Sequence, residues 1–488
     1  MKSFFLKIYH LKPFFNHRKA WFLLIACSIF VLLRLPSLIE PYWYGDEGIY
    51  QVVARALLQG KTLYKDIWDN KPPLLYIIYA LTLGNLFLVK LLSLLSGLLS
   101  VVVFFLLTEK IFNKILSRNV ATLVYAVLFG LPVLEGNVAN AENFMLLPII
   151  LSAYFVISFS ENKKNTIIIA AGFLLSIAFI TKIVAVFDFA AFFLFMFFIE
   201  WSHQRKISVR TYVIYSLSFL SLLIFSSAYF FSVGAFKDFI GSVFLQNVSY
   251  VGDQNKFIFP MGILVIKTII LFVSLLILFI KKNKISKSTL FIYMWIIFSI
   301  FNAFFSERPY IHYLLVLLPA FALLTGHFFD RTKTRIIDGS IIFIIIFFAL
   351  FHFQIYYKTF TYYGNYVKFL TNQKTIVDYE AFFDAYTPRD YDIANFIDMN
   401  VAGNEKIFLW SDSAQIYALS NKLPLGKYIV AYHITFYKNA DVITKEQIEK
   451  AQPKYIIQTI EEPFVKDISS SYRLRYIMEG ARIYEREI

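Results

Sequence analysis

Apolar runs of about 20 residues recur along the chain and constrain its fold more than any other feature, because a helix of that length crosses a bilayer. Inside lipid every backbone N–H and C=O must be paired within its own segment, so runs without strand alternation predict helices. Eleven such runs lie at 20–38, 86–107, 119–134, 144–160, 165–181, 183–200, 210–233, 260–280, 288–305, 310–328 and 336–355. The sequence therefore predicts an α-helical polytopic membrane protein with about 11–13 crossings.

Composition excludes the other broad classes of protein. The 488 residues are 58% hydrophobic and 16% charged, whereas soluble globular proteins are about 45–50% apolar and about 25% charged. A single cysteine excludes a disulfide scaffold. One apolar segment, 72–84, is too short to span comfortably, and we interpret it as a half-crossing or an interfacial helix. If it does cross, the number of spans and the topology change.

Lysine and arginine gather in loops that would all lie on one side of the membrane. With eleven crossings, six basic groups share that side: the N-terminus up to Lys19; Lys110, Lys114 and Arg118; Lys163 and Lys164; Arg205, Lys206 and Arg210; Lys281, Lys282, Lys284 and Lys287; and Arg331, Lys333 and Arg335. Short loops rich in lysine and arginine stay in the cytoplasm. The formal charge of +14 is therefore interpreted as a topological signal, and no nucleic-acid partner is expected.

The chain loses its apolar character from about residue 375. Thr387 and Pro388 are suited to start a helix that runs towards Asn400, and KIFLW (406–410) is typical of a strand. Thr444 and Gln447 form a capping-box pattern before a second helix, and KYIIQT (454–459) predicts a second strand. This alternation predicts a small α/β domain with a partly parallel sheet, and an odd number of crossings places it outside the cell.

The first candidate site is the acid pair Asp46 and Glu47 in YWYGDEGIY, flanked by Trp43, Tyr44 and Tyr50. A carboxylate at a dry, aromatic-rich mouth can act as a general base. The alternative is an ordinary hydrated acid pair beside interfacial aromatic residues, and the pattern alone favours neither.

The second candidate is Lys71 in WDNKPP, where Pro72 and Pro73 prevent a helix from starting earlier and hold the lysine at the edge of the short apolar segment. An ammonium there suits a phosphate at headgroup level. A snorkelling lysine, or one bound to ordinary lipid phosphate, explains the position equally well.

Three weaker candidates lie on the same side of the membrane. Asn140 and Glu142 open a middle span, where helix capping is the simpler explanation, and Lys182 ends a span at its outer boundary. Arg308 and His312 in ERPYIHY have the i,i+4 spacing that would aim both at one place if a helix begins near 309. Arginine offers a fork for phosphate, but a histidine can equally bond a neighbouring helix.

The sequence supports no metal site or other cofactor. The seven histidines are scattered without a paired ligand spacing, and the lone Cys27 lies in an apolar span. Carboxylates on the outer side could bind a divalent metal, but no pattern indicates one.

In order along the chain, GDEG, WDNKPPL, NAEN and ERPYIHY resemble motifs of the GT-C superfamily of glycosyltransferases that use polyprenyl-phosphate sugars. The similarity is closest to bacterial glycosyltransferase family 39, related to protein O-mannosyltransferases and to the aminoarabinose transferases of lipid A. It covers about residues 20–328. The resemblance implies a GT-C catalytic domain at 20–360 with an outer loop at 39–85, between a cytoplasmic N-terminus (1–19) and an extracytoplasmic domain at 375–488.

The resemblance also implies roles for single residues. Asp46 matches the base that deprotonates the acceptor hydroxyl, and Glu47 matches the second acid of that pair. Lys71 matches the lysine associated with the donor's phosphate, and Arg308 and His312 match a segment with a phosphate-facing role. Glu142 matches an acid at the outer start of a middle span, with Asn140 and Lys182 as supporting residues. Asn70 stands where some aminoarabinose transferases carry an acid or histidine, which argues against transferring a metal site or that sugar specificity.

These implications combine into one expected function. The chain would be a multi-pass enzyme of the plasma membrane that moves a sugar, with inversion, from a polyprenyl-phosphate donor to an unidentified acceptor: a protein, a lipid or a cell-envelope glycan. A secondary transporter or a lipid flippase is the main alternative, although transporters place ionisable residues near the midplane and often show repeated halves. A non-catalytic membrane scaffold is the third.

Overall fold

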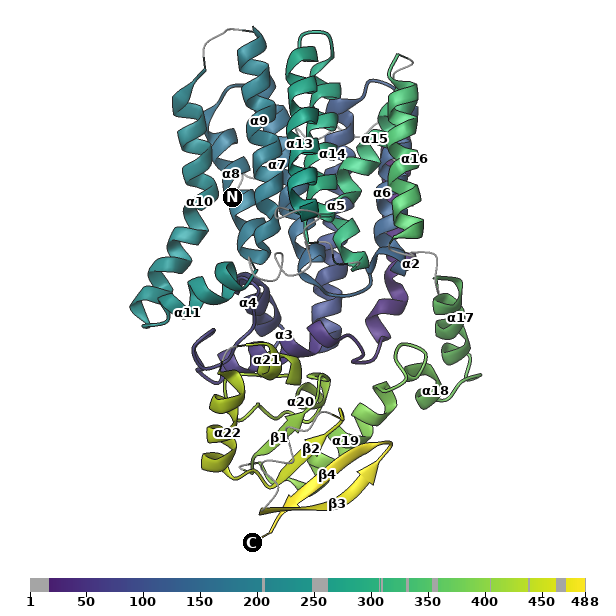
Figure 1. Cartoon of the computed structure of the whole chain (residues 1–488). Coiled ribbons are helices and arrows are strands. Elements are labelled where there is room, and N and C mark those ends of the chain that lie inside the picture. Colours follow the sequence, from purple (N-terminus) through teal and green to yellow (C-terminus); the bar gives the residue numbers. More distant parts are fainter. Residues whose placement is uncertain are drawn as a thin grey trace, which may run out of the picture.

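A helix bundle with a small α/β domain at one end makes up the computed structural model of the chain (Figure 1). The structure describes residues 17–203, 207–247, 262–306, 308, 310–330, 333–352, 359–403, 405–437, 439–461 and 471–487. Most of the predicted basic N-terminus (1–19) and residues 205, 206 and 331 of the basic loops lie outside these ranges.

Each predicted span coincides with a helix of the bundle. These are α2 (His17–Arg34), α5 (Leu86–Ile111), α6 (Ile115–Gly130), α7 (Ala141–Glu161), α8 (Asn165–Thr181), α9 (Val186–His203), α10 (Val209–Ser232), α13 (Gly262–Lys281), α14 (Lys287–Ala303), α15 (Leu318–Asp330) and α16 (Arg335–Phe351). The helix expected from residue 310 starts later, at Leu318, because a separate 3₁₀ helix, η5 (Ile311–Leu315), precedes α15.

Six stretches among the described residues are long and apolar enough to cross a membrane by length and composition. They are His17–Ile39, Leu86–Ile111, Ala141–Glu161, Ile183–Ser202, Val209–Ser232 and Ile263–Lys281, and Ile115–Gly130, Asn165–Thr181 and Lys287–Ala303 are shorter apolar helices. The chain is thus a multi-pass membrane protein.

The loops that carry the basic groups, such as those between α5 and α6, α13 and α14, and α15 and α16, lie at the end of the bundle opposite the α/β domain (Figure 1). Ion pairs connect neighbouring helices there: Lys19 of α2 lies 2.6 Å from Glu109 of α5, and Lys110 of α5 lies 2.9 Å from Glu161 of α7. The predicted clustering on one side is therefore confirmed for the loops that the structure describes. We call the other end, next to the α/β domain, the domain end.

Short helices build the domain end: η1 (Leu35–Ile39), α3 (Gly45–Leu58), α4 (Pro73–Leu81), η2 (Pro132–Leu134), η3 (Ile183–Ala185), α11 (Phe236–Ile240) and the π-helical η4 (Gly241–Leu245). The sequence analysis missed α3, which carries Asp46 in its first turn. The nine residues of α4 are about 14 Å long at 1.5 Å per residue, so this helix cannot cross a bilayer.

The C-terminal domain consists of α17 (Thr359–Leu370), α18 (Ile376–Glu380), α19 (Thr387–Asn400), β1 (Ile407–Trp410), α20 (Gln415–Leu419), α21 (Ala431–Phe436), α22 (Ala440–Ala451), β2 (Tyr455–Gln458), β3 (Tyr472–Met478) and β4 (Ala481–Arg486). The sheet order is β1-β2-β4-β3, and β1 pairs with β2 in parallel, as expected. The antiparallel hairpin of β3 and β4 was not predicted. The predicted capping box was wrong, since Thr444 lies inside α22 and bonds Ala440 O at 2.7 Å.

The C-terminal domain packs directly on α3. Both terminal nitrogens of Arg55 donate to carbonyls at the end of α20, those of Tyr417 and Ala418, at 3.1 Å each. Gly48 approaches α20 so closely that a Cβ at this position would lie 2.8 Å from the backbone nitrogen of Gln415. The helix that carries Asp46 is therefore held between the bundle and the C-terminal domain.

Candidate active site

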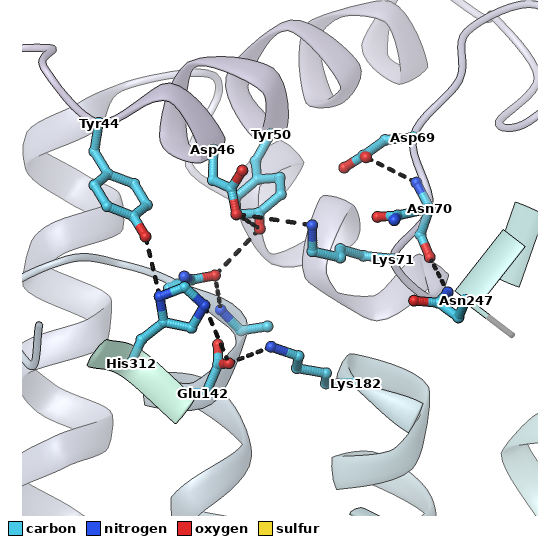
Figure 2. Close-up of polar contacts among 12 residues, drawn as sticks. Tyr44, Asp46, Tyr50, Asp69, Asn70, Lys71, Glu142, Lys182, Asn247 and His312 are labelled. Atoms are coloured by element: carbon cyan, nitrogen blue, oxygen red, sulfur yellow. Dashed lines mark hydrogen bonds and ion pairs between the residues drawn. The ribbon is translucent and has the colours of Figure 1, made fainter. Parts of the chain in front are cut away.

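Asp46 lies in the first turn of α3, with its side chain 30% exposed (Figure 2). The Tyr50 hydroxyl donates to Asp46 Oδ2 at 2.9 Å, and Lys71 Nζ lies 3.7 Å from the same oxygen. Burial raises the pKa of Asp46, but the charges of Lys71 and His312 and the bond from Tyr50 outweigh it, so the pKa is lowered. Asp46 is thus a carboxylate at neutral pH.

The backbone around Lys71 is fixed by two buried tyrosines. The Tyr64 hydroxyl donates to Lys71 O at 2.7 Å, and Lys71 N donates to the Tyr76 hydroxyl at 3.1 Å. Tyr76 in turn donates to Asp69 Oδ2 at 2.7 Å. Burial opposes a charged lysine, but Asp46 and Asp69 raise the pKa of Lys71, so its ammonium is retained.

A second set of charges faces the first, from other helices (Figure 2). Glu142 opens α7, and its Oε1 pairs with the ammonium of Lys182, which follows the last residue of α8. His312 Nε2 lies 3.7 Å from Glu142 Oε1. Lys182 Nζ also lies 4.7 Å from the centre of the Tyr313 ring. Two carboxylates, two lysines and a histidine therefore lie together at the domain end.

Asn140 connects the two sets. Its Oδ1 lies 3.1 Å from the Tyr50 hydroxyl and accepts the Ala141 N–H at 2.7 Å, which caps α7. Tyr50 therefore stands within hydrogen-bond distance of both Asp46 and Asn140. The helix-capping explanation for Asn140 holds, but the same oxygen also belongs to the site.

The structure adds two residues that the sequence analysis did not select. His312 Nδ1 lies 2.9 Å from Glu135 Oε2 and 3.2 Å from the hydroxyl of Tyr44, which itself donates to Glu135 at 3.0 Å. Glu135 follows η2 in the left-handed conformation (φ 55°), a strained backbone for this residue that no sequence pattern announces. Tyr44 directly precedes GDEG, and this position beside the motif is the sequence feature that could have indicated it as a site residue.

Glu47 does not join the residues around Asp46. Its side chain is 1% exposed, Oε1 accepts the Ala139 N–H at 2.7 Å and Oε2 lies 3.5 Å from Lys90 Nζ. Lys90, also fully buried, lies 2.9 Å from Glu40. Burial raises the pKa of Glu47 despite the opposing effects of Lys90 and the Ala139 N–H. We expected both acids to face one site, but the structure places Glu47 in a different set of contacts from Asp46.

Arg308 also departs from its expected geometry. The helix expected to begin near 309 begins after Tyr310, so Arg308 and His312 are not four residues apart on one helix. The charge of Arg308 acts instead on the phenol of Tyr437, next to α21 of the C-terminal domain.

No group of three or more histidine, cysteine, aspartate or glutamate side chains among the described residues could hold a metal ion. What the site offers is a carboxylate able to accept a proton, beside ammonium groups able to bind an anion.

Comparisons with known proteins found a family model and two similar structures. The family model described as dolichyl-phosphate-mannose-protein mannosyltransferase matches residues 71–230. The structure is similar to two crystal structures of ArnT from Cupriavidus metallidurans, each 13% identical in sequence. The form bound to undecaprenyl phosphate has a TM-score of 0.57 over 95% of this chain and 97% of that one. The apo form has a TM-score of 0.59 over 96% and 98%.

The chain has the fold of a GT-C superfamily glycosyltransferase. The resemblance drawn from the four motifs is confirmed at this level, as is the expected helical membrane architecture with a small C-terminal α/β domain. No curated protein sequence matches the chain. Within the GT-C fold, Lys71 stands at the first residue of the matched family region.

Proposed function

We propose that this membrane glycosyltransferase moves a sugar from a polyprenyl-phosphate donor to a hydroxyl of an extracytoplasmic acceptor, with inversion and with Asp46 as the base. The observation that carries this proposal is the pair formed by Asp46 and Lys71, 3.7 Å apart and fixed by tyrosines at the domain end. It places a proton acceptor beside a cation that can bind a phosphate. The GT-C fold and the similar ArnT with bound undecaprenyl phosphate support a lipid-linked donor.

The proposed reaction is a single displacement. The acceptor oxygen forms a bond to the anomeric carbon while the bond from that carbon to the phosphate oxygen breaks, and its electron pair leaves with the polyprenyl phosphate. Asp46 Oδ takes the proton of the attacking hydroxyl. A positioned base of this kind contributes typically about 10²–10⁴-fold in rate. Because the pKa of Asp46 is lowered, the carboxylate is in the base form throughout the physiological range.

The proposed phosphate site uses the cations around Asp46. Lys71 would bind the donor phosphate and stabilise the charge that builds on it as the sugar leaves. Lys182 and His312 would extend this positive region, held in place by Glu142 and Glu135. Arg308, whose charge acts on Tyr437 of the C-terminal domain, would approach the phosphate from the side of that domain. Glu47 would position α3 through Lys90 rather than touch the substrate.

The direction of transfer follows from the basic loops. Short loops rich in lysine and arginine stay in the cytoplasm, so the domain end, opposite to them, would be extracytoplasmic (Figure 1). The N-terminus would then be cytoplasmic. The acceptor, whether protein, lipid or cell-envelope glycan, would reach the site from the aqueous side, while the lipid donor would enter from the bilayer.

Native mass spectrometry of the detergent-purified protein, titrated with undecaprenyl phosphate and a panel of its sugar-loaded forms, tests the donor site. We expect saturable binding that Lys71→Ala weakens and that Lys61→Ala, which removes an exposed lysine on the same loop, leaves unchanged. Asp46→Asn should still bind the donor but fail to transfer the sugar. Absence of binding by folded protein would favour the transporter or scaffold alternative, whereas movement of the lipid across a membrane without transfer of its sugar would favour the flippase.

A further inference from the structure

The C-terminal domain touches both motif segments of the candidate site. The side-chain nitrogen of Gln415 donates to Trp43 O at 3.1 Å, next to the segment that carries Asp46. The backbone N–H of Trp68 donates to Lys427 O at 2.9 Å, three residues before Lys71. The domain is therefore part of the wall around the site and not a separate appendage.

Two consecutive residues of α21, Tyr432 and His433, occupy this wall. The turn after β1 holds the start of the helix, since the Ala431 N–H donates to Ser411 O at 2.9 Å and the Tyr432 N–H donates to Asp412 Oδ1 at 3.0 Å. Ligand sites of α/β sheets form beyond the carboxyl ends of parallel strands, which is where β1 places both residues. In Figure 1, α21 lies between the sheet and α3.

His433 is buried without a complete set of hydrogen bonds. It is 2% exposed, and its Nδ1 has no hydrogen-bond partner among the described residues. Its ring stands edge-on to Trp68, with the ring centres 4.9 Å apart. Burial lowers the pKa of His433 to about 4, with the charges of Asp69 and Lys71 acting in opposite directions. The imidazole is thus neutral at physiological pH, able to accept or donate one hydrogen bond at Nδ1.

A buried polar atom without a partner is destabilising, so each one in a folded protein needs an explanation, and a partner that arrives with a ligand is one. Two more buried side-chain atoms lack a hydrogen-bond partner among the described residues. They are Asn70 Oδ1, directly before Lys71, and Oε1 of Gln415, the first residue of α20 in the C-terminal domain. These atoms would suit a ligand rich in hydroxyl groups.

Tyr432 adds an apolar surface beside His433. It is 43% exposed, and its ring centre lies 4.6 Å from that of His433. Burial and, after it, the charges of Asp46 and Asp69 raise the pKa of its phenol, so both acids of the candidate site act on this residue. An exposed aromatic face next to a hydrogen-bonding group matches a sugar ring, which has apolar C–H faces and polar edges.

We propose that Tyr432 and His433 form the subsite for the sugar of the donor, with Tyr432 contacting a face of the ring and His433 Nδ1 hydrogen-bonding one of its hydroxyls. This inference rests on the proposed function, because the sugar must be delivered on a phosphate bound by Lys71. The C-terminal domain would then select the sugar, while the bundle binds the lipid phosphate.

Comparing two ligands in native mass spectrometry separates the subsite from the phosphate site. Wild-type protein should bind sugar-loaded undecaprenyl phosphate about tenfold more tightly than bare undecaprenyl phosphate, the contribution of one or two good hydrogen bonds. His433→Phe, which keeps an aromatic ring but removes the nitrogen, should bring this ratio towards one without changing the affinity for the bare lipid. His433→Asn, which keeps a polar atom near the position of Nδ1, should preserve much of the preference.

Tyr432→Ala should also reduce the ratio, whereas Tyr476→Ala, which removes a similarly exposed tyrosine (41%) from β3, should not. Thermal unfolding of each variant shows that it is folded. An unchanged ratio in folded His433→Phe and Tyr432→Ala overturns the subsite, as does a wild-type ratio of one across the panel. Failure of the proposed function looks different, because wild-type protein would then bind neither form of the lipid.

Discussion

Asp46 and Glu47 are neighbours in the chain, but their carboxylates face two different regions of the molecule. Asp46 lies among residues from the motif segments, partly exposed and within reach of a substrate, and its pKa is lowered. Glu47 is buried against Lys90 and the Ala139 N–H, and its pKa is raised. Consecutive residues of a helix point about 100° apart, so one turn of α3 supplies both a reactive group and an anchor.

The two regions depend on each other. Lys90 binds two glutamates. Glu40 directly follows η1, before the loop that leads to α3, and Glu47 lies in the first turn of α3. Glu40 also accepts hydrogen bonds from Trp43 at 3.0 Å and Asn137 at 2.8 Å, and from the hydroxyl of Tyr362 in α17. This buried cluster therefore fixes the segment that presents Asp46 and ties it to α17 of the C-terminal domain.

The largest expected effect separates the two acids directly. Asp46→Asn should lower the rate of sugar transfer by about 10²–10⁴-fold and leave the fold intact, since only the base is lost. Glu47→Gln should lower the thermal stability more than the rate, because Gln keeps an acceptor for Ala139 but no charge for Lys90. Transfer assays and thermal unfolding of both variants in detergent measure this contrast. Equal losses of rate in the two folded variants would contradict the division of roles.

Removing Lys90 should cause the largest loss of stability. In Lys90→Met two buried carboxylates lose their cation, and breaking a buried pair in this way costs about 3–5 kcal/mol. Lys110→Met is the matched control on the same helix, since the exposed pair of Lys110 with Glu161 is worth about 0–1 kcal/mol. Thermal unfolding should therefore distinguish the two variants clearly, and similar midpoints would show that the buried cluster does not hold α3.

The sequence predicted the spans and the site to different degrees. Apolar length located helices such as α5 and α8 within a few residues, because burial in lipid requires little else. The four motifs also supplied Asp46, Lys71, Glu142 and His312. The separation of Glu47 from Asp46 was not predictable, because it depends on α3. The glycines and acids at the start of this helix did not indicate a helix in the sequence.

Contacts between distant segments were equally invisible in the sequence. Glu135 reaches His312 across 177 positions, and Tyr362 reaches Glu40 across 322. The start of η5 after Tyr310 leaves Arg308 outside the helix that carries His312, since a proline in the sequence restricts its own φ but does not determine where a helix begins. Such pairings follow from how the helices pack, which hydrophobic patterns alone do not specify.

A smaller effect should come from the contact between α3 and the C-terminal domain. Gly48→Ala places a Cβ 2.8 Å from the backbone of Gln415, so the domain must shift away from the site. We expect a loss of stability of about 1–3 kcal/mol and a moderate loss of transfer. Gly45→Ala, on the same turn with no heavy atom within 4 Å of the new Cβ, is the control. Wild-type behaviour of Gly48→Ala would show that the domain adjusts without cost.

The smallest expected effect concerns the pH dependence of Asp46. A base with a lowered pKa keeps transfer constant through neutral pH and loses it only as the pH falls through that pKa, which lies under the ordinary value of an aspartate. Tyr50→Phe removes the hydrogen bond that helps to lower the pKa of Asp46, so the acid limb of the rate profile should move to higher pH. Asn140 also loses a partner, and the rate at neutral pH should fall only a few-fold. Because Glu47 does not contact Tyr50, Glu47→Gln should leave the acid limb where it is. If the acid limb shifts in Glu47→Gln but not in Tyr50→Phe, the titrating acid is Glu47, and the roles assigned to the two acids are wrong.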